Sequence, residues 1–153
     1  MYDGLLALER MERAVLKVRE RLLRATAALE AAGVPYAVVG DNAVAAWVEQ
    51  VDEAAVRATQ DVDLAVRRSD FAAARAALEG AGFVHRTVSG LEVFLDASTG
   101  RVRDAVHIVF AGEPVRPEHI GPAPDVSEAT SFQAFRVANL EALVRMKLMA
   151  YRD

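Results

Sequence analysis

Two aspartates stand two residues apart in the stretch RATQDVDLAV, which spans residues 57–66. Polar and apolar residues alternate from Asp61 to Val66, a pattern typical of a half-buried β-strand. Asp61 and Asp63 then share one strand face at roughly 7 Å, where two ionised carboxylates repel unless a positive charge lies between them. The pair indicates a divalent cation such as Mg²⁺, which takes carboxylates, water and phosphates as ligands. The alternative is an ordinary strand whose carboxylates face solvent.

A glycine turn precedes this strand in the chain. The β-prone run 36–39 ends at Gly40, and Asp41 or Asn42 is suited to cap a helix over 43–50. Backbone N–H groups at a helix start, together with the positive end of the helix dipole, attract phosphate. We therefore expect a phosphate-binding bend followed by a strand that carries the carboxylates.

The remaining pattern predicts one α/β domain. Apolar residues recur at helical spacing between Leu5 and Ala32, which predicts a long helix with one buried stripe. The members of that stripe are Leu8, Met11, Val15, Val18, Leu22 and Leu29. A further helix is expected over 71–78, capped by Ser69 or Asp70. Strands are expected over 83–88, 91–95 and 102–110, joined as an antiparallel meander.

The C-terminal third has a different composition. Residues 111–131 hold four of the five prolines, and we expect this segment to wrap the surface. Asn139 is suited to cap a last helix that runs to about Tyr151. The buried stripe of that helix is predicted to comprise Leu140, Leu143, Val144, Leu148 and Tyr151, with Lys147 in its middle.

Composition limits the functional classes. The 153 residues are 53% apolar and 26% charged, which suits a single globular domain over 1–153. The net charge of −4 gives no overall basic field, so a polyanionic partner would have to be held locally. Cysteine is absent, which excludes disulfides and thiolate metal sites and favours a cytoplasmic location. No signal-peptide core or membrane span is found in the sequence, so no membrane partner is expected.

The run YAVVGDNAVAAW, followed by RATQDVDLAV, resembles the nucleotidyltransferase superfamily, especially its small bacterial AbiEii-like and antitoxin-like branch. Members of that branch read G-G-[ST/N]-A and then R-x-T-x-D-[IV]-D-[LIV], and the resemblance covers about residues 34–110 and, weakly, the last helix. It implies a nucleotidyltransferase fold, with a small mixed, mainly antiparallel sheet flanked by helices. The implied reaction is metal-dependent transfer of a nucleotidyl group from a nucleoside triphosphate to a hydroxyl.

In that family the glycine turn cradles the triphosphate, the aspartate pair holds two Mg²⁺ ions, and a third acidic residue lies on a later strand. By position the resemblance assigns phosphate binding to Gly40 and Asn42, and metal binding to Asp61 and Asp63. Asp41 departs from the pattern, because the family has glycine there and an aspartate repels phosphate unless it turns away to cap the helix.

The third acidic position falls on His107 in the run VHIVF. A histidine there could serve as a general base, or could ligate Mn²⁺ or Zn²⁺, but Mg²⁺ prefers oxygen. The alternative third acid is Asp104, which strict strand alternation places on the face opposite His107 unless a β-bulge intervenes. The metal, Mg²⁺ or Mn²⁺, stays open at this stage.

Two basic residues complete the candidate site. Arg57 could hold a phosphate, clamp Asp61, or simply be solvated. Lys147 could reach the nucleotide phosphates, as a lysine at this place does in similar proteins, or could extend past the edge of the core to water. Similar proteins continue with another helix, whereas this chain ends at YRD, so part of the acceptor-binding region is expected to be missing.

Two hypotheses of different class follow. The first is an active nucleotidyltransferase whose acceptor is an RNA end, a protein side chain or a small molecule. The second is a degenerate transferase domain that acts as an antitoxin or as the partner-binding half of a two-component system, which Asp41 and His107 favour. A weaker third is a structural domain whose acidic pair limits aggregation. The enzyme hypothesis requires Asp61 and Asp63 to lie in one pocket with the Gly40 bend.

Overall fold

The computed structural model describes residues 2–51, 61–97, 100–116, 119, 121–132 and 134–151. The helices are α1 (Tyr2–Ala31), α2 (Gly40–Val51), α3 (Phe71–Gly80) and α4 (Leu140–Tyr151), with short 3₁₀ helices at Arg68–Asp70 and Val102–Asp104. The strands are β1 (Ala37–Val39), β2 (Val62–Val66), β3 (Phe83–Val88), β4 (Leu91–Asp96), β5 (Val106–Phe110), β6 (Ala129–Ser131) and β7 (Arg136–Ala138).

The strands form one seven-stranded mixed sheet in the order β3-β4-β5-β2-β1-β7-β6. Only the β2–β5 and β1–β7 pairs are parallel, and the other neighbours are antiparallel. The predicted meander is the β3-β4-β5 half of this sheet. The expected fold class, a mainly antiparallel sheet flanked by helices, is therefore confirmed.

The central strand β2 follows the predicted alternation. Val62, Leu64 and Val66 are fully buried, and Asp63 between them is only half-buried. Ala65 is also fully buried, so the second face of this strand is covered beyond Asp63. Asp63 is thus a carboxylate at the border of the core.

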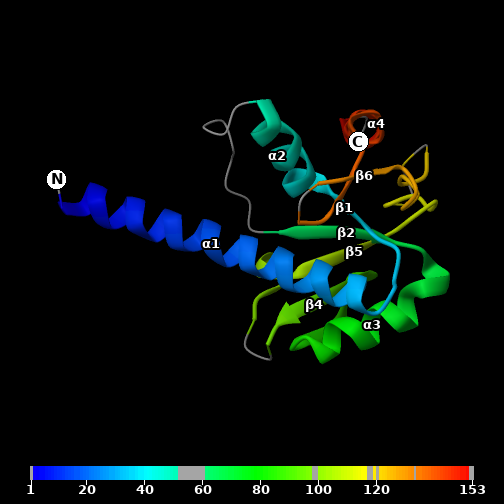
Figure 1. Cartoon of the computed structure of the whole chain (residues 1–153), viewed down its shortest axis with the longest axis horizontal. Coiled ribbons are helices and arrows are strands. Elements are labelled where there is room, and N and C mark those ends of the chain that lie inside the picture. The colour runs from blue at the N-terminus through cyan, green and yellow to red at the C-terminus, as the bar shows by residue number, and fades with distance from the viewer. Residues whose placement is uncertain are drawn as a thin grey trace.

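Helix α1 runs across the strands, and its N-terminal half projects beyond the sheet (Figure 1). Leu22 and Leu29 are buried, as predicted. Leu8 and Val15 belong to the same predicted stripe but are exposed, so that part of the prediction is wrong. The spacing of apolar residues is correct for a helix, but the helix is longer than the sheet that it covers.

The last helix begins as predicted. Asn139 Oδ1 accepts a hydrogen bond from the backbone N–H of Ala142 at 2.9 Å. The predicted buried stripe is confirmed at Leu143 but is wrong at Leu140, Val144 and Leu148, which are exposed. Ala142, which the stripe did not include, is buried instead. Helix α4 packs beside α2, on the side of the molecule away from α3 (Figure 1).

Two further differences concern loops. The predicted strand 102–110 is divided, because Val102–Asp104 forms a 3₁₀ turn and β5 starts only at Val106. The proline-rich segment ends in the short strand β6 and is tied back to the end of β2 by the ion pairs Arg67–Asp125 and Arg68–Glu113. None of the helices in the described part of the chain has the length and apolarity needed to cross a membrane.

Candidate active site

The bend at Gly40 and the carboxylate of Asp63 are in direct contact. Strand β1 pairs with β2 so that Val39 lies opposite Asp63, and Gly40 follows with a positive φ of 71°. A Cβ placed on Gly40 would collide with the Asp63 carboxylate, and would lie 3.2 Å from its Cβ and Cγ. Both the left-handed backbone and the contact therefore require glycine. The carboxylate lies against the backbone from which α2 starts.

The first turn of α2 also binds the entry to β2. The Asn42 side-chain amide donates a hydrogen bond to the backbone carbonyl of Asp61. Helix α2 begins at Gly40, so the prediction that Asp41 or Asn42 is the N-cap is wrong, and both residues lie inside the first turn. Asp41 is exposed, yet its charge still acts on Asp63. The first turn is therefore held beside the aspartate strand by Asn42.

His107 lies opposite Asp63 because β5 runs parallel to β2 in the register Asp63↔His107. Its Nδ1 is 3.7 Å from Asp63 Oδ1, and its Nε2 is 2.8 Å from the carbonyl oxygen of Val102. A carbonyl only accepts, so we assign the Nε2 proton to this bond. Nδ1 is then the ring nitrogen that faces the carboxylate, at a distance longer than a direct hydrogen bond.

Burial raises the pKa of Asp63 to about 6, because the charged carboxylate loses solvation. A positive charge on His107 acts in the opposite direction, and the negative charges of Asp61 and Asp41 raise the pKa further. The site therefore has more carboxylates than cations among the described residues that act on Asp63.

Two other predicted residues, Asp104 and Lys147, have no described contact with this cluster. Asp104 lies in the 3₁₀ turn, where Arg101 binds it at 3.1 Å, so the strand alternation that placed it on the face opposite His107 does not apply. Lys147 is exposed on α4 rather than enclosed in a buried stripe. Arg57 lies outside the described residues.

The side chains present suit a metal cation whose coordination sphere is completed by water or by a bound phosphate. Asp61 and Asp63 offer carboxylate oxygens beside an uncompensated negative charge, and such oxygens suit Mg²⁺ or Mn²⁺. Within the described residues no group of three or more His, Cys, Asp or Glu side chains could hold a metal ion. Water or phosphate oxygens would have to supply the remaining ligands.

Sequence reasoning missed two features. It did not identify Val102, whose carbonyl orients His107, because strand alternation was assumed through that residue. It also missed a row of basic residues on α1, comprising Arg10, Arg13, Lys17 and Arg21. Their spacing of three, four and four residues was a visible signal, since it places them on one helical face.

Comparisons with known proteins give a fold and no closer assignment. No protein-family model matches the chain, and no curated protein matches it. Among solved structures, the crystal structure of ANT(2'')-Ia in complex with adenylyl-2''-tobramycin matches with a TM-score of 0.54 at 14% identity, covering 84% of this chain and 73% of that chain. The solution structure of the antibiotic-resistance factor ANT(2'')-Ia matches with a TM-score of 0.52 at 16% identity, covering 79% of this chain and 64% of that one.

ANT(2'')-Ia is an aminoglycoside nucleotidyltransferase, so the expected nucleotidyltransferase-like fold is confirmed. At this level of identity the likeness concerns the fold alone. The narrower prediction of an AbiEii-like or antitoxin-like protein stays a prediction.

Proposed function

We propose that this protein is a metal-dependent nucleotidyltransferase that moves a nucleotidyl group from a nucleoside triphosphate to a hydroxyl acceptor. The observation that carries this proposal is the contact between the Asp63 carboxylate and the Gly40 backbone, with Asp61 and His107 beside it. The nucleotidyltransferase-like fold supports it. The active unit proposed is the single domain 1–153.

In the proposed reaction, the acceptor oxygen forms a bond to the α-phosphorus and the bond from that phosphorus to the bridging oxygen breaks, which releases pyrophosphate. The N–H groups of the first turn of α2, fixed by Asn42, would bind the phosphates. The proton of the acceptor hydroxyl would pass to His107, whose Nδ1 is the ring nitrogen turned toward the site.

Asp61 and Asp63 would hold the cation, Mg²⁺ or Mn²⁺, and when bound it would neutralise negative charge that develops on the phosphates. His107 would then lie beside the metal without coordinating it, since Mg²⁺ prefers oxygen ligands. This role suits its hydrogen bond to Val102, which fixes the ring by its other nitrogen.

Thermal unfolding with each of ATP, CTP, GTP and UTP, with and without Mg²⁺ or Mn²⁺, tests the proposal. A nucleotide at about 100 times its Kd should stabilise the folded protein by about 2.7 kcal/mol, and only when the metal is present. The double variant Asp61→Asn/Asp63→Asn should lose this stabilisation completely, because it removes both metal-binding carboxylates.

A matched control removes two carboxylates elsewhere. Glu49 near the end of α2 and Glu141 at the start of α4 are both exposed, so Glu49→Gln/Glu141→Gln changes the net charge equally. This control should keep the full metal-dependent stabilisation. A response that is the same in both double variants, or absent from the unmodified protein, would contradict the proposal.

The second candidate function is a binding module, either an antitoxin or another partner-binding protein, built on a degenerate transferase domain. Its support is the negative charge of Asp41 close to Asp63, together with a histidine where the resemblance expects a third carboxylate. A flat thermal response to all four nucleotides, in a protein that folds normally, would favour this candidate.

A further inference from the structure

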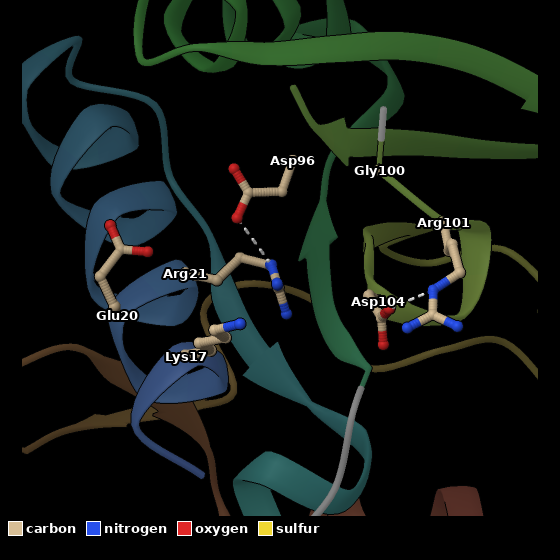
Figure 2. Close-up of a pocket in the computed structure, with 7 residues that line it drawn as sticks. All are labelled: Lys17, Glu20, Arg21, Asp96, Gly100, Arg101 and Asp104. Atoms are coloured by element: carbon tan, nitrogen blue, oxygen red, sulfur yellow. Dashed lines mark hydrogen bonds and ion pairs between the residues drawn. The ribbon is translucent and has the colours of Figure 1, made fainter. Parts of the chain in front are cut away.

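A groove lined by five basic side chains and by the carboxylates of Glu20, Asp96 and Asp104 lies between α1 and the 3₁₀ turn Val102–Asp104. It consists of two adjoining hollows of about 400 and 540 Å³. The residues that line both hollows are Lys17, Arg21, Arg101 and Asp104. Figure 2 shows Lys17 and Arg21 on the helix, with Arg101 and Asp104 across the gap.

Positive charge dominates the larger hollow. Five cationic side chains and one carboxylate line it, although the chain as a whole has a net charge of −4. They are Arg10, Arg13, Lys17, Arg21, Arg101 and Asp104. Such a local excess of one sign in a concave surface attracts the opposite charge.

The charges in the groove divide into paired and free groups. Arg21 binds Asp96 at 3.1 Å, and Arg101 binds Asp104 at 3.1 Å. Arg10 and Lys17 have no ion-pair partner within the described residues, and the ammonium group of Lys17 points into the gap (Figure 2). The free cations are therefore available to an external anion.

The row of basic residues on α1 is long enough to contact several phosphates of an extended chain. Residues 10 to 21 of an α-helix extend over about 16 Å, with a basic side chain at nearly every turn of about 5.4 Å. A single phosphate would use one or two of these side chains, whereas a chain of phosphates would reach several of the free ones together. Among the described residues that line the hollows there is no aromatic ring, so no base-stacking platform is present.

The groove and the candidate active site share one wall. The backbone carbonyl of Val102 binds His107, while Asp104 of the same turn and the adjacent Arg101 line the groove. A strand that lies in the groove therefore passes close to the turn that positions His107.

We propose that the groove binds the phosphate backbone of a single nucleic-acid strand without reading its bases, and so presents the hydroxyl of that strand as acceptor. The acceptor role rests on the proposed transferase function, whereas the binding itself does not. The concave form of the groove suits a strand better than it suits the flat surface of an anionic membrane.

Fluorescence anisotropy with a short labelled single-stranded RNA of mixed sequence tests the binding. The triple variant Arg10→Gln/Arg13→Gln/Lys17→Gln changes only exposed side chains on the projecting half of α1. We expect it to weaken binding by at least about tenfold, and to reduce the slope of log K against log salt by about 2, because each lost phosphate contact contributes about 0.7.

The matched control is Arg19→Gln/Arg86→Gln/Arg116→Gln, which removes the same charge from exposed positions outside the groove. It should bind the RNA nearly as well as the unmodified protein. Equal weakening by both triples, or no RNA binding at low salt, would overturn the inference.

Two further measurements distinguish RNA from other ligands that carry phosphate groups. Binding of inorganic triphosphate that the variant Arg10→Gln/Arg13→Gln/Lys17→Gln abolishes, together with no binding of RNA, would mean a small-anion site and would overturn the strand proposal. Sedimentation with vesicles of anionic phospholipid, lost in the groove triple while RNA does not bind, would reassign the surface to a membrane. The groove triple should keep the metal-dependent nucleotide stabilisation described above, so failure of the groove and failure of the transferase proposal give different results.

Discussion

Asp63 on β2 and Asp96 on β4 are equally exposed carboxylates in one sheet that behave in opposite ways. The side chain of Asp63 is 29% exposed and that of Asp96 is 28% exposed. Burial alone raises the pKa of both. Hydrogen bonds and the charges of Arg24 and Arg21 outweigh that effect at Asp96 and hold its pKa below the usual value, whereas the pKa of Asp63 rises to about 6.

The difference lies in the partners and in the packing around each carboxylate, because Asp63 is surrounded by more protein atoms although the two side chains expose similar fractions. Arg24 Nη2 lies 2.6 Å from Asp96, and Arg21 Nε lies 3.1 Å from it, so this carboxylate fastens α1 to the end of β4. Asp63 has other carboxylates near it and one histidine. A carboxylate with a fixed arginine stabilises the fold, and one without it is left for a ligand.

The largest expected effect is on the paired carboxylate. Asp96→Asn should lower the free energy of unfolding by about 2 to 4 kcal/mol, because Arg21, itself buried, would lose its charged partner. Urea unfolding followed by circular dichroism measures this change. A loss of less than about 0.5 kcal/mol would mean that this ion pair contributes no more to stability than an ordinary surface pair. The proposed contrast between Asp96 and Asp63 would then be wrong.

An effect of opposite sign is expected at the unpaired carboxylate. The folded-state pKa of Asp63 is raised from 3.8 to about 6, so the folded protein binds more protons than the unfolded chain between these pH values. Stability from this group is therefore complete below about pH 4 and is lost as pH rises through about 6. Asp63→Asn removes that loss, and should be more stable than the unmodified protein by about 1 to 3 kcal/mol at pH 7.5.

The pH dependence separates this cause from general repacking. Melting temperatures measured without metal should nearly coincide at pH 4 and should diverge between pH 4 and 6. A difference that is constant over this range would mean that proton binding at Asp63 does not control the stability of this region.

The smallest effect is expected at an ion pair on the surface. Arg68 binds Glu113 through Nε at 2.8 Å, but their side chains are 64% and 39% exposed. Glu113→Gln should therefore leave the free energy of unfolding nearly unchanged, as measured in the same urea series. A loss as large as that of Asp96→Asn would show that solvent exposure does not explain why the ion pair of Glu113 contributes less to stability than that of Asp96.

Most of the framework could be predicted from local pattern. The alternation in β2, the Asn139 cap and the glycine bend depend on residues close in sequence, and local sterics and hydrogen bonds decide them. The shared strand face of Asp61 and Asp63 stays a prediction, because β2 begins only at Val62. The contact between Gly40 and Asp63 required one further step, the expectation that the two segments lie side by side.

What could not be predicted depends on where an element meets the rest of the fold. Leu8 and Leu148 fit helical stripes but are exposed, because a helical period gives no information on how far the partner surface extends. Asp104 fitted a strand, but the chain turns there and Arg101 binds it. The pairing of Asp63 with His107 follows from a parallel register that only the assembled sheet defines.

The absence of room for any side chain at position 40 ties the identity of that residue to the identity of position 63. Relatives that share this backbone should vary at the two positions together. Where alanine or a larger residue replaces the glycine, the aspartate should be replaced by something smaller, since an unaltered carboxylate would occupy the same space. Aligned sequences could reveal this covariation, and a single well-folded relative with serine at the first position and aspartate at the second would speak against it.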